Sequence, residues 1–87
     1  MEKNYNDAIG EWLMNERIRQ GLSQQDIAEK LGTTRTAVHY WESGKRTIYA
    51  DNMINYCYAL NVDPSQLIKD VTSNKKTLPK GDKEGSF

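Results

Sequence analysis

The feature that most constrains this chain is a stretch of twenty residues that follows Ser23 and has a glycine near its middle. Ser23 can cap a helix at its N-terminus, and Asp26 stands three positions later, where a capping-box partner belongs. Gly32 suits the left-handed position that ends a helix, and Thr33 or Thr34 can cap a second helix directly after it. The pattern predicts two short helices joined by a tight glycine turn.

Apolar residues recur at helical spacing on both sides of that turn, so each helix has one face to bury. The two stripes are Ile27, Ala28 and Leu31, then Ala37, Val38 and Trp41. Gly44 follows the second stripe and is the expected end of the second helix.

Three further helices are expected from the same periodicity. The first covers residues 6–20 and ends at Gly21, the fourth covers residues 49–60 and ends at Asn61, and the fifth opens at Asp63 and runs to about Lys69. Inward residues are expected to be Ile9, Trp12, Leu13 and Ile18 in the first helix, and Met53, Ile54, Tyr56, Cys57 and Leu60 in the fourth.

The 87 residues allow one small domain, expected at residues 1–70, followed by a flexible polar tail at residues 71–87. No apolar run approaches the roughly 18 residues of a membrane-spanning helix, and the acidic start is unlike a signal peptide, so we expect a cytoplasmic protein. Cys57 is expected to be a small buried hydrophobe rather than a reactive thiol. A single Cys and a single His leave no plausible zinc site.

The chain carries no net charge, which alone argues against a nucleic-acid partner because phosphate binding usually requires a basic surface. The charges are unevenly placed, however. Residues 1–70 contain eight lysines and arginines against ten acids, whereas the window from Lys30 to Arg46 holds four basic residues against the single acid Glu42. A basic segment within a mildly acidic domain is typical of a protein that touches DNA with one edge.

Residues 22–45 closely resemble the Cro/repressor-type, or XRE-like, helix-turn-helix family of bacteria and their phages. The most diagnostic positions are the small Ala28 where the two helices cross, Gly32 in the turn, and Val38 with Trp41 on the inner face of the second helix. Flanking segments extend the resemblance to about residues 9–68. The resemblance implies an all-α, compact, five-helix domain of the lambda-repressor type, whose third helix enters the major groove.

The family's base-reading positions fall on Thr34, Arg35, Thr36 and Tyr40. Arg35 carries the most weight, because its planar guanidinium can donate two hydrogen bonds to guanine O6 and N7. Thr34 and Thr36 can each offer a hydroxyl and a methyl group to a base or a phosphate. The structural alternatives are that Thr34 only caps its helix and that Tyr40 only covers the surface.

Phosphate contacts are expected from Gln24, His39, Lys45 and Arg46. In family members a glutamine at the position of Gln24 binds a phosphate and braces the recognition helix. Lys45 and Arg46, together with free backbone N–H groups after Gly44, suit phosphate clamps that set register without reading sequence. For His39 the alternative is a neutral imidazole on the surface.

Arg17 and Glu42 fall where the family often places a partly buried ion pair between the first and third helices, so a structural pair is expected here. The chain also departs from the family pattern. It has no proline before the fourth helix, and Tyr56 stands where a smaller aliphatic residue is usual. Tyr58 is expected to face outward, either as a dimer anchor or as a lone surface residue.

The leading hypothesis is a sequence-specific transcriptional regulator, a repressor that binds a pseudo-palindromic operator on double-stranded DNA as a homodimer. The alternative is a protein-interaction module of the same fold, such as an antirepressor, antitoxin or assembly subunit, which the zero net charge favours. An enzyme is not expected, because the sequence lacks a glycine-rich phosphate loop and a nucleophile placed with a histidine and an acid. We therefore expect no catalytic residue, cofactor or small-molecule substrate.

Overall fold

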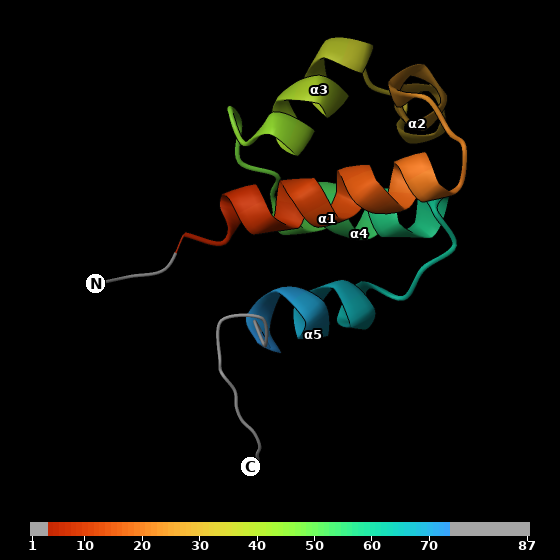
Figure 1. Ribbon diagram of the computed structural model, residues 1–87. Coiled ribbons are helices and arrows are strands. Elements are labelled where there is room, and N and C mark those ends of the chain that lie inside the picture. Colours follow the sequence, from red (N-terminus) through yellow and green to blue (C-terminus); the bar gives the residue numbers. More distant parts are fainter. Residues whose placement is uncertain (1–3, 74–87) are drawn as a thin grey trace.

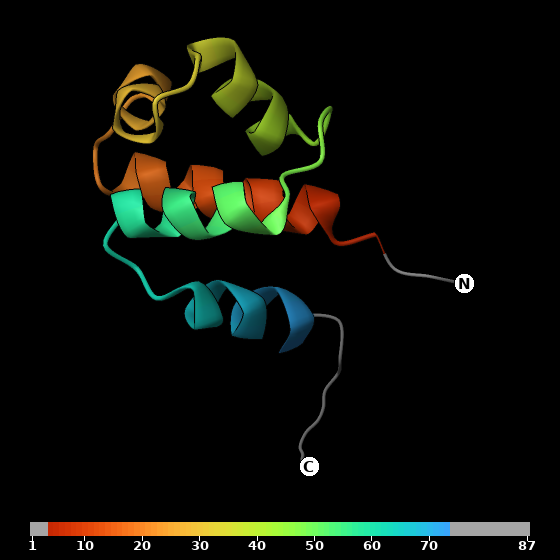
Figure 2. The ribbon, with the colours of Figure 1, turned by 180° about the vertical axis from the view of Figure 1, so that it is seen from behind.

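The computed structural model describes residues 4–73 of the chain. They form five helices, which are α1 (Asn6–Arg19), α2 (Gln24–Leu31), α3 (Arg35–Ser43), α4 (Ala50–Ala59) and α5 (Pro64–Ser73). Figure 1 and the reverse view in Figure 2 show three layers, with α1 and α4 in the middle, α2 and α3 on one side and α5 on the other. The described part contains no strand, and the expected all-α, five-helix fold is confirmed.

Helices α2 and α3 begin and end where the sequence predicts. The Ser23 hydroxyl accepts a hydrogen bond from the Asp26 backbone N–H at 2.9 Å, and the Asp26 carboxylate accepts one from the Ser23 N–H, also at 2.9 Å. This reciprocal capping box opens α2, and Gly32 ends it in the left-handed conformation, at φ 70°. Of the two candidate threonines, Thr34 caps α3 by accepting from the Ala37 N–H at 3.1 Å.

The core lies between the α2–α3 pair and the two middle helices, and α5 closes it from below. Its fully or nearly fully buried residues are Leu13, Ile27, Ala28, Ala37, Val38, Trp41, Ile48, Tyr56, Cys57, Leu60 and Leu67. Two expected core residues are wrong, since Ile18 is 57% exposed and Ile54 is 36% exposed. In α1 the residue that points inward is Arg17, and its neighbour Ile18 points to solvent. In α4 the buried face contains Tyr56 and Cys57, and Ile54 lies outside that face.

Gly10 on α1 is buried for a reason that the sequence pattern did not indicate. A Cβ atom at this position would lie 2.4 Å from the Trp41 carbonyl oxygen and 2.8 Å from that of Glu42. Both atoms belong to the backbone of α3, so they cannot move aside as a flexible side chain would. The absence of a side chain at Gly10 therefore lets α1 cross directly beneath α3 and sets the depth at which α3 sits.

The fifth helix is longer than expected, because it continues to Ser73 instead of ending near Lys69. Two contacts explain the extension. Val71 packs against the core, and the Trp12 indole N–H donates a hydrogen bond to the Asp70 carboxylate at 2.8 Å, which ties α5 to α1. The first three residues of the expected tail are thus helical, and the rest of that tail lies outside the described residues. None of the described helices is long and apolar enough to cross a membrane.

Candidate nucleic-acid interface

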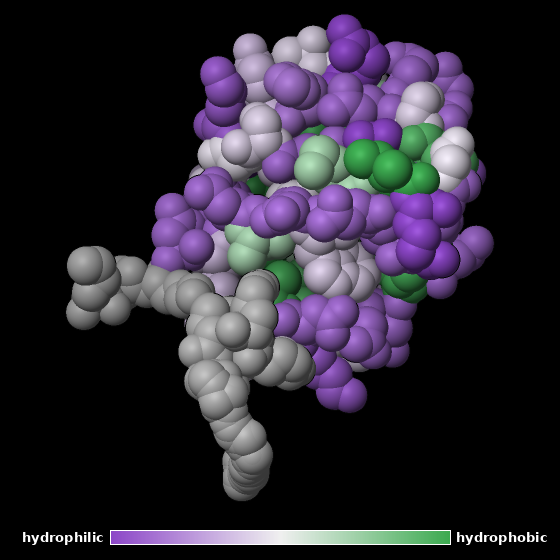
Figure 3. Space-filling model, viewed as in Figure 1, coloured by the Kyte–Doolittle hydropathy of each residue, from purple (hydrophilic) through white to green (hydrophobic). Residues whose placement is uncertain are grey.

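Helix α3 divides its residues sharply between the interior and the surface. Its inward face buries Ala37, Val38, Trp41 and Glu42 against the other helices. Its outward face and its N-terminus expose the candidate base-reading residues Thr34, Arg35 and Thr36, together with His39. In Figure 3 the surface over the α3 end of the molecule is mainly hydrophilic. The helix therefore presents a polar, partly basic ridge that no described part of the chain covers.

Arg35 begins α3 and lies close to the start of α2. Its guanidinium Nη1 donates a hydrogen bond of 3.4 Å to the Gln24 side-chain oxygen, so the two expected DNA-contacting residues are neighbours. Thr34 Oγ1 already accepts the capping bond from Ala37, which shows that the structural alternative for this hydroxyl is real. Its O–H can still donate to a phosphate or base, because a hydroxyl is both donor and acceptor.

Tyr40 is half-buried, and the structure groups it with two of the expected phosphate contacts. The Arg46 guanidinium carbon lies 5.2 Å from the centre of the Tyr40 ring, within the range of a cation–π contact. The centre of the His39 ring lies 5.8 Å from that of the Tyr40 ring. Tyr40 therefore supports Arg46 at the surface, which is closer to the covering role than to free presentation of its ring.

The loop after Gly44 carries Lys45 and Arg46, both exposed. The expected free backbone N–H groups are wrong for Arg46, whose N–H donates to the Tyr40 carbonyl at 3.2 Å. The loop is also tied to α1, because the Asn6 side-chain amide donates to the Gly44 carbonyl at 3.0 Å. The Arg46 backbone N–H is thus not available to an anion, whereas the side chains of Lys45 and Arg46 are exposed.

Arg17 and Glu42 form the expected ion pair between α1 and α3, and both are almost fully buried. Arg17 Nε donates to Glu42 Oε2 at 2.7 Å and Nη2 donates to Oε1 at 2.9 Å, a two-pronged arrangement. The remaining Nη1 donates to the Leu22 carbonyl at 2.8 Å, just before α2. One guanidinium therefore holds together α1, the start of α2 and the middle of α3.

Glu42 has two further donors on its carboxylate. The Gln24 side-chain N–H donates to Oε1 at 3.0 Å, and the Tyr56 hydroxyl donates to Oε2. Burial by itself raises the pKa of the Glu42 carboxyl, but the hydrogen bonds from Arg17, Tyr56 and Gln24 outweigh it and hold that pKa below its ordinary value. Glu42 is therefore ionised at neutral pH, and its charge organises the polar centre beneath α3.

The role of Tyr56 was missed by sequence reasoning, which placed it in the core only as an apolar residue. Its side chain is fully buried, and burial together with the charge of Glu42 raises the pKa of its hydroxyl well above the usual range. A signal was present in the sequence. A tyrosine at a core position where a smaller aliphatic residue is usual needs a polar partner for its hydroxyl, and Glu42 was the acid expected to be partly buried.

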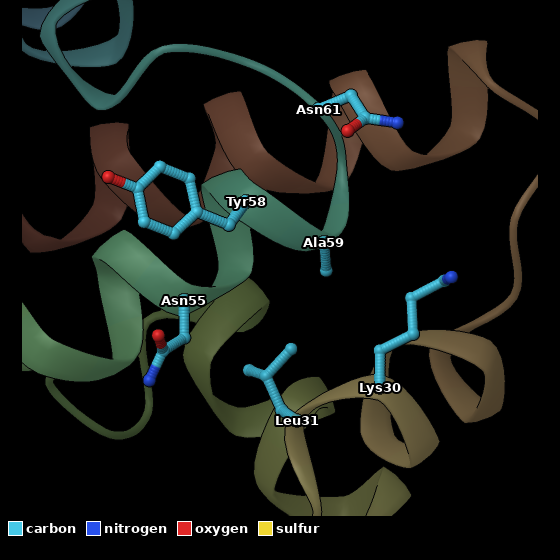
Figure 4. Close-up of a pocket in the computed structure, with 6 residues that line it drawn as sticks. All are labelled: Lys30, Leu31, Asn55, Tyr58, Ala59 and Asn61. Atoms are coloured by element: carbon cyan, nitrogen blue, oxygen red, sulfur yellow. The ribbon is translucent and has the colours of Figure 1, made fainter.

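Within residues 4–73, no cluster of three His, Cys, Asp or Glu residues could hold a metal ion. Cys57 is fully buried, as expected, and burial raises the pKa of its thiol to about 11. Figure 4 shows an open hollow on another face, between the C-terminal ends of α2 and α4. It is lined by Lys30, Leu31, Asn55, Tyr58, Ala59 and Asn61.

A sequence model described as helix-turn-helix matches residues 13–67 of this chain. The restriction-modification controller protein C.AhdI from Aeromonas hydrophila is similar in structure, with a TM-score of 0.67 and 31% identity, over 70% of this chain and 92% of that chain. The clp gene regulator ClgR from C. glutamicum shares the fold, with a TM-score of 0.77 over 90% of this chain and 99% of that chain, at 17% identity. No curated protein sequence matches the chain.

Proposed function

This chain belongs to the helix-turn-helix family of DNA-binding regulators, and we propose that it is a repressor that binds a pseudo-palindromic operator as a homodimer in the cytoplasm. The observation that carries the proposal is the exposure of Arg35 at the N-terminus of a helix whose other face is fully committed to the core. A guanidinium in that position can approach base edges when α3 lies in the major groove.

The proposed base contacts are Thr34, Arg35, Thr36 and Tyr40, and the proposed phosphate contacts are Gln24, His39, Lys45 and Arg46. Arg35 supplies the main discrimination by donating to guanine O6 and N7, which is worth about 1–3 kcal/mol against a wrong base. Lys45 and Arg46 flank the helix at its other end and supply sequence-independent attraction to the backbone. The polar ridge of α3 and the exposed basic loop beside it support this division of roles.

The homodimer is proposed because a single α3 reads only one short half-site, and two-fold symmetry doubles the contacts and sets half-sites about one helical turn apart. Tyr58, which is 65% exposed on α4, is the aromatic residue proposed to anchor the partner. It lines the hollow at the ends of α2 and α4, and none of the proposed base-reading residues is part of that lining. A partner bound there leaves Arg35 free for DNA.

The second candidate is an interaction module of the same fold without DNA recognition. It is favoured by the zero net charge and by the exposed apolar side chains of Ile54 and Tyr58 on α4. Arg35 and the Lys45–Arg46 loop argue against it, because none of these exposed cations has a structural duty comparable to that of Arg17. The two candidates differ in one respect that is simple to measure, namely affinity for duplex DNA.

The test is selection of bound duplexes from a random pool, followed by gel-shift measurements at two salt concentrations. We expect a symmetric consensus, tighter binding at low salt, and a loss of about 1–3 kcal/mol of base discrimination in Arg35→Ala. Arg19→Ala is the matched control, because Arg19 is an exposed arginine on α1, far from α3 in the sequence, and should leave binding unchanged. Selection without a consensus, or equal binding by Arg35→Ala, would favour the interaction module.

A further inference from the structure

The polar centre beneath α3 contains one group that the proposed DNA contacts do not use, the hydroxyl of Tyr56. This hydroxyl comes from α4 and donates to Glu42 Oε2 inside the core. It is not needed to hold Glu42 in place, because the two-pronged contact with Arg17 already fixes that carboxylate. Nor does the ring need the hydroxyl to fill its site, since Phe has nearly the same shape. The hydroxyl must therefore be explained by what it does to the carboxylate.

An ionised carboxylate has about four acceptor sites, two on each oxygen. Arg17 occupies one site on Oε1 and one on Oε2, and Tyr56 occupies the second site on Oε2. The single site left is on Oε1, and Gln24 Nε2 occupies it at 3.0 Å. Tyr56 thus leaves Gln24 one place to donate to, rather than two.

The orientation of the Gln24 amide follows from the chemistry of the carboxylate, whereas the sites that Arg17 and Tyr56 occupy fix which oxygen the amide meets. Because a carboxylate only accepts, the amide must turn its NH₂ group inward and its oxygen outward. The outward oxygen accepts from Arg35 Nη1 at 3.4 Å. A continuous chain of hydrogen bonds therefore runs from Tyr56 in the core, through Glu42 and Gln24, to the guanidinium at the surface.

We propose that Tyr56 is a positioning residue for base recognition, which fixes the Gln24 amide through Glu42 and thereby holds the Arg35 guanidinium in the direction that reads guanine. The inference rests on the proposed function, in which Arg35 is the main base contact. Tyr56 touches no DNA, and its effect is on specificity. An Arg35 guanidinium that Gln24 already holds loses less conformational entropy when it binds a base than an unconstrained guanidinium does. The attraction of Lys45 and Arg46 to phosphates does not depend on it.

The test is Tyr56→Phe, which removes only the hydroxyl, compared with Tyr5→Phe, which removes the hydroxyl of an exposed tyrosine just before α1. In Tyr56→Phe we expect the preference for guanine at the position read by Arg35 to fall about threefold to tenfold, the size of one net hydrogen bond, with affinity for unrelated duplex unchanged. Tyr5→Phe should retain the full preference. Equal preference in Tyr56→Phe and wild type, or a uniform loss on all duplexes, would overturn the proposal.

A second variant separates positioning from a general loosening of the core. Gln24→Ala breaks the chain of hydrogen bonds at its middle, so it should cause a similar loss of preference, and adding Tyr56→Phe to it should cause no further loss. Full additivity of the two changes would show that Tyr56 does not act through Gln24. Thermal unfolding of each variant establishes that all are folded at the temperature of the binding measurement.

A measurement on the free protein makes failure of this inference distinguishable from failure of the proposed function. The side-chain amide protons of Gln24 can be followed by NMR without DNA, and we expect their exchange with water to be at least about threefold faster in Tyr56→Phe than in wild type. Unchanged exchange would overturn the positioning role. If wild type binds no duplex but its Gln24 amide responds in this way, the proposed function fails while the internal chain of hydrogen bonds is supported.

Discussion

The two faces of α3 differ in what specifies their residues. Contacts with several other helices constrain the residues of the inward face. Val38 and Trp41 are in the core, and Glu42 accepts hydrogen bonds from side chains of α1, α2 and α4. The outward face meets solvent, and the side-chain contacts of Arg35, and of Arg46 in the loop that follows, are one weak hydrogen bond and one contact with a ring. One helix thus combines a side that the fold requires with a side that the fold leaves free.

This difference between the two faces predicts which substitutions should lower stability and which should weaken DNA binding. Changes on the inward face remove contacts within the chain, so they should lower the free energy of unfolding. Changes on the outward face should leave that free energy within about 0.5 kcal/mol and alter only binding. The predictions below test this division, beginning with the largest expected effect.

Glu42→Gln should cause the largest loss of stability. The change keeps the size of the side chain but removes the charge that Arg17 is buried to meet, and stranding a buried charge commonly costs about 3–5 kcal/mol. Chemical denaturation followed by circular dichroism measures this loss. The matched control is Glu16→Gln, because Glu16 pairs with Arg19 on the surface of α1 and such pairs contribute about 0–1 kcal/mol. Equal stability of the two variants would contradict the division between faces.

Gly10→Ala tests the support beneath the inward face. Helix propensity alone predicts a gain of about 1 kcal/mol from this change, whereas the contact of the new Cβ with the Trp41 and Glu42 carbonyl oxygens predicts a loss of about 1–3 kcal/mol. The sign of the change in the free energy of unfolding therefore decides between them. Glu11→Ala, at an exposed position next to it, should change stability little.

Acid should weaken the inward face through Glu42. Its carboxyl has a lower pKa in the folded protein than its ordinary value of 4.5, so its contribution to stability is complete above about pH 4.5 and is lost as the pH falls below that. Asp26 and Asp63, whose pKa values are lowered by hydrogen bonds at helix starts, act in the same direction. As the pH falls below about 4.5, the free energy of unfolding should therefore decrease less steeply in Glu42→Gln than in wild type. Parallel curves would show that Glu42 does not contribute.

Lys45→Ala tests the outward side and should have the smallest effect. The side chain is exposed, so the melting temperature should stay that of wild type. Removing one phosphate contact should reduce the slope of log affinity against log salt concentration by about 1 and weaken binding to all sequences alike. Lys69→Ala, an exposed lysine on α5, should leave the slope unchanged. A shared effect of both lysines would mean that the loop after α3 has no privileged role in DNA attraction.

The sequence predicts the helix ends of this protein well because their signals are local. Ser23, Asp26, Gly32 and Thr34 act within a few residues of themselves, and the structure places each in the expected cap or turn. The extension of α5 to Ser73 was not predicted, because it depends on contacts that Val71 and Asp70 make with distant parts of the chain. Local rules therefore predict where helices begin better than how far tertiary contacts prolong them.

The site was predictable where the resemblance supplied it and not where distant contacts decide. Arg17 and Glu42 meet as the resemblance implies, yet periodicity alone assigned Ile18 to the interior. Gly10 and the Tyr56 hydroxyl were missed because their roles appear only once α1 and α4 are packed near α3. Arg46 shows the same limit, since its backbone N–H is used by Tyr40 in a loop whose path no sequence signal fixes.

The central claim is that the outward face of α3 is the surface that meets DNA, and NMR titration of the ¹⁵N-labelled protein with a duplex from the random-pool selection tests it most directly. The account predicts that the largest chemical-shift changes occur at Gln24, at residues 34–40 and at Lys45 and Arg46, with α5 unaffected. Changes confined to Asn55, Tyr58 and their surroundings, with Arg35 and Thr36 unmoved, would contradict it.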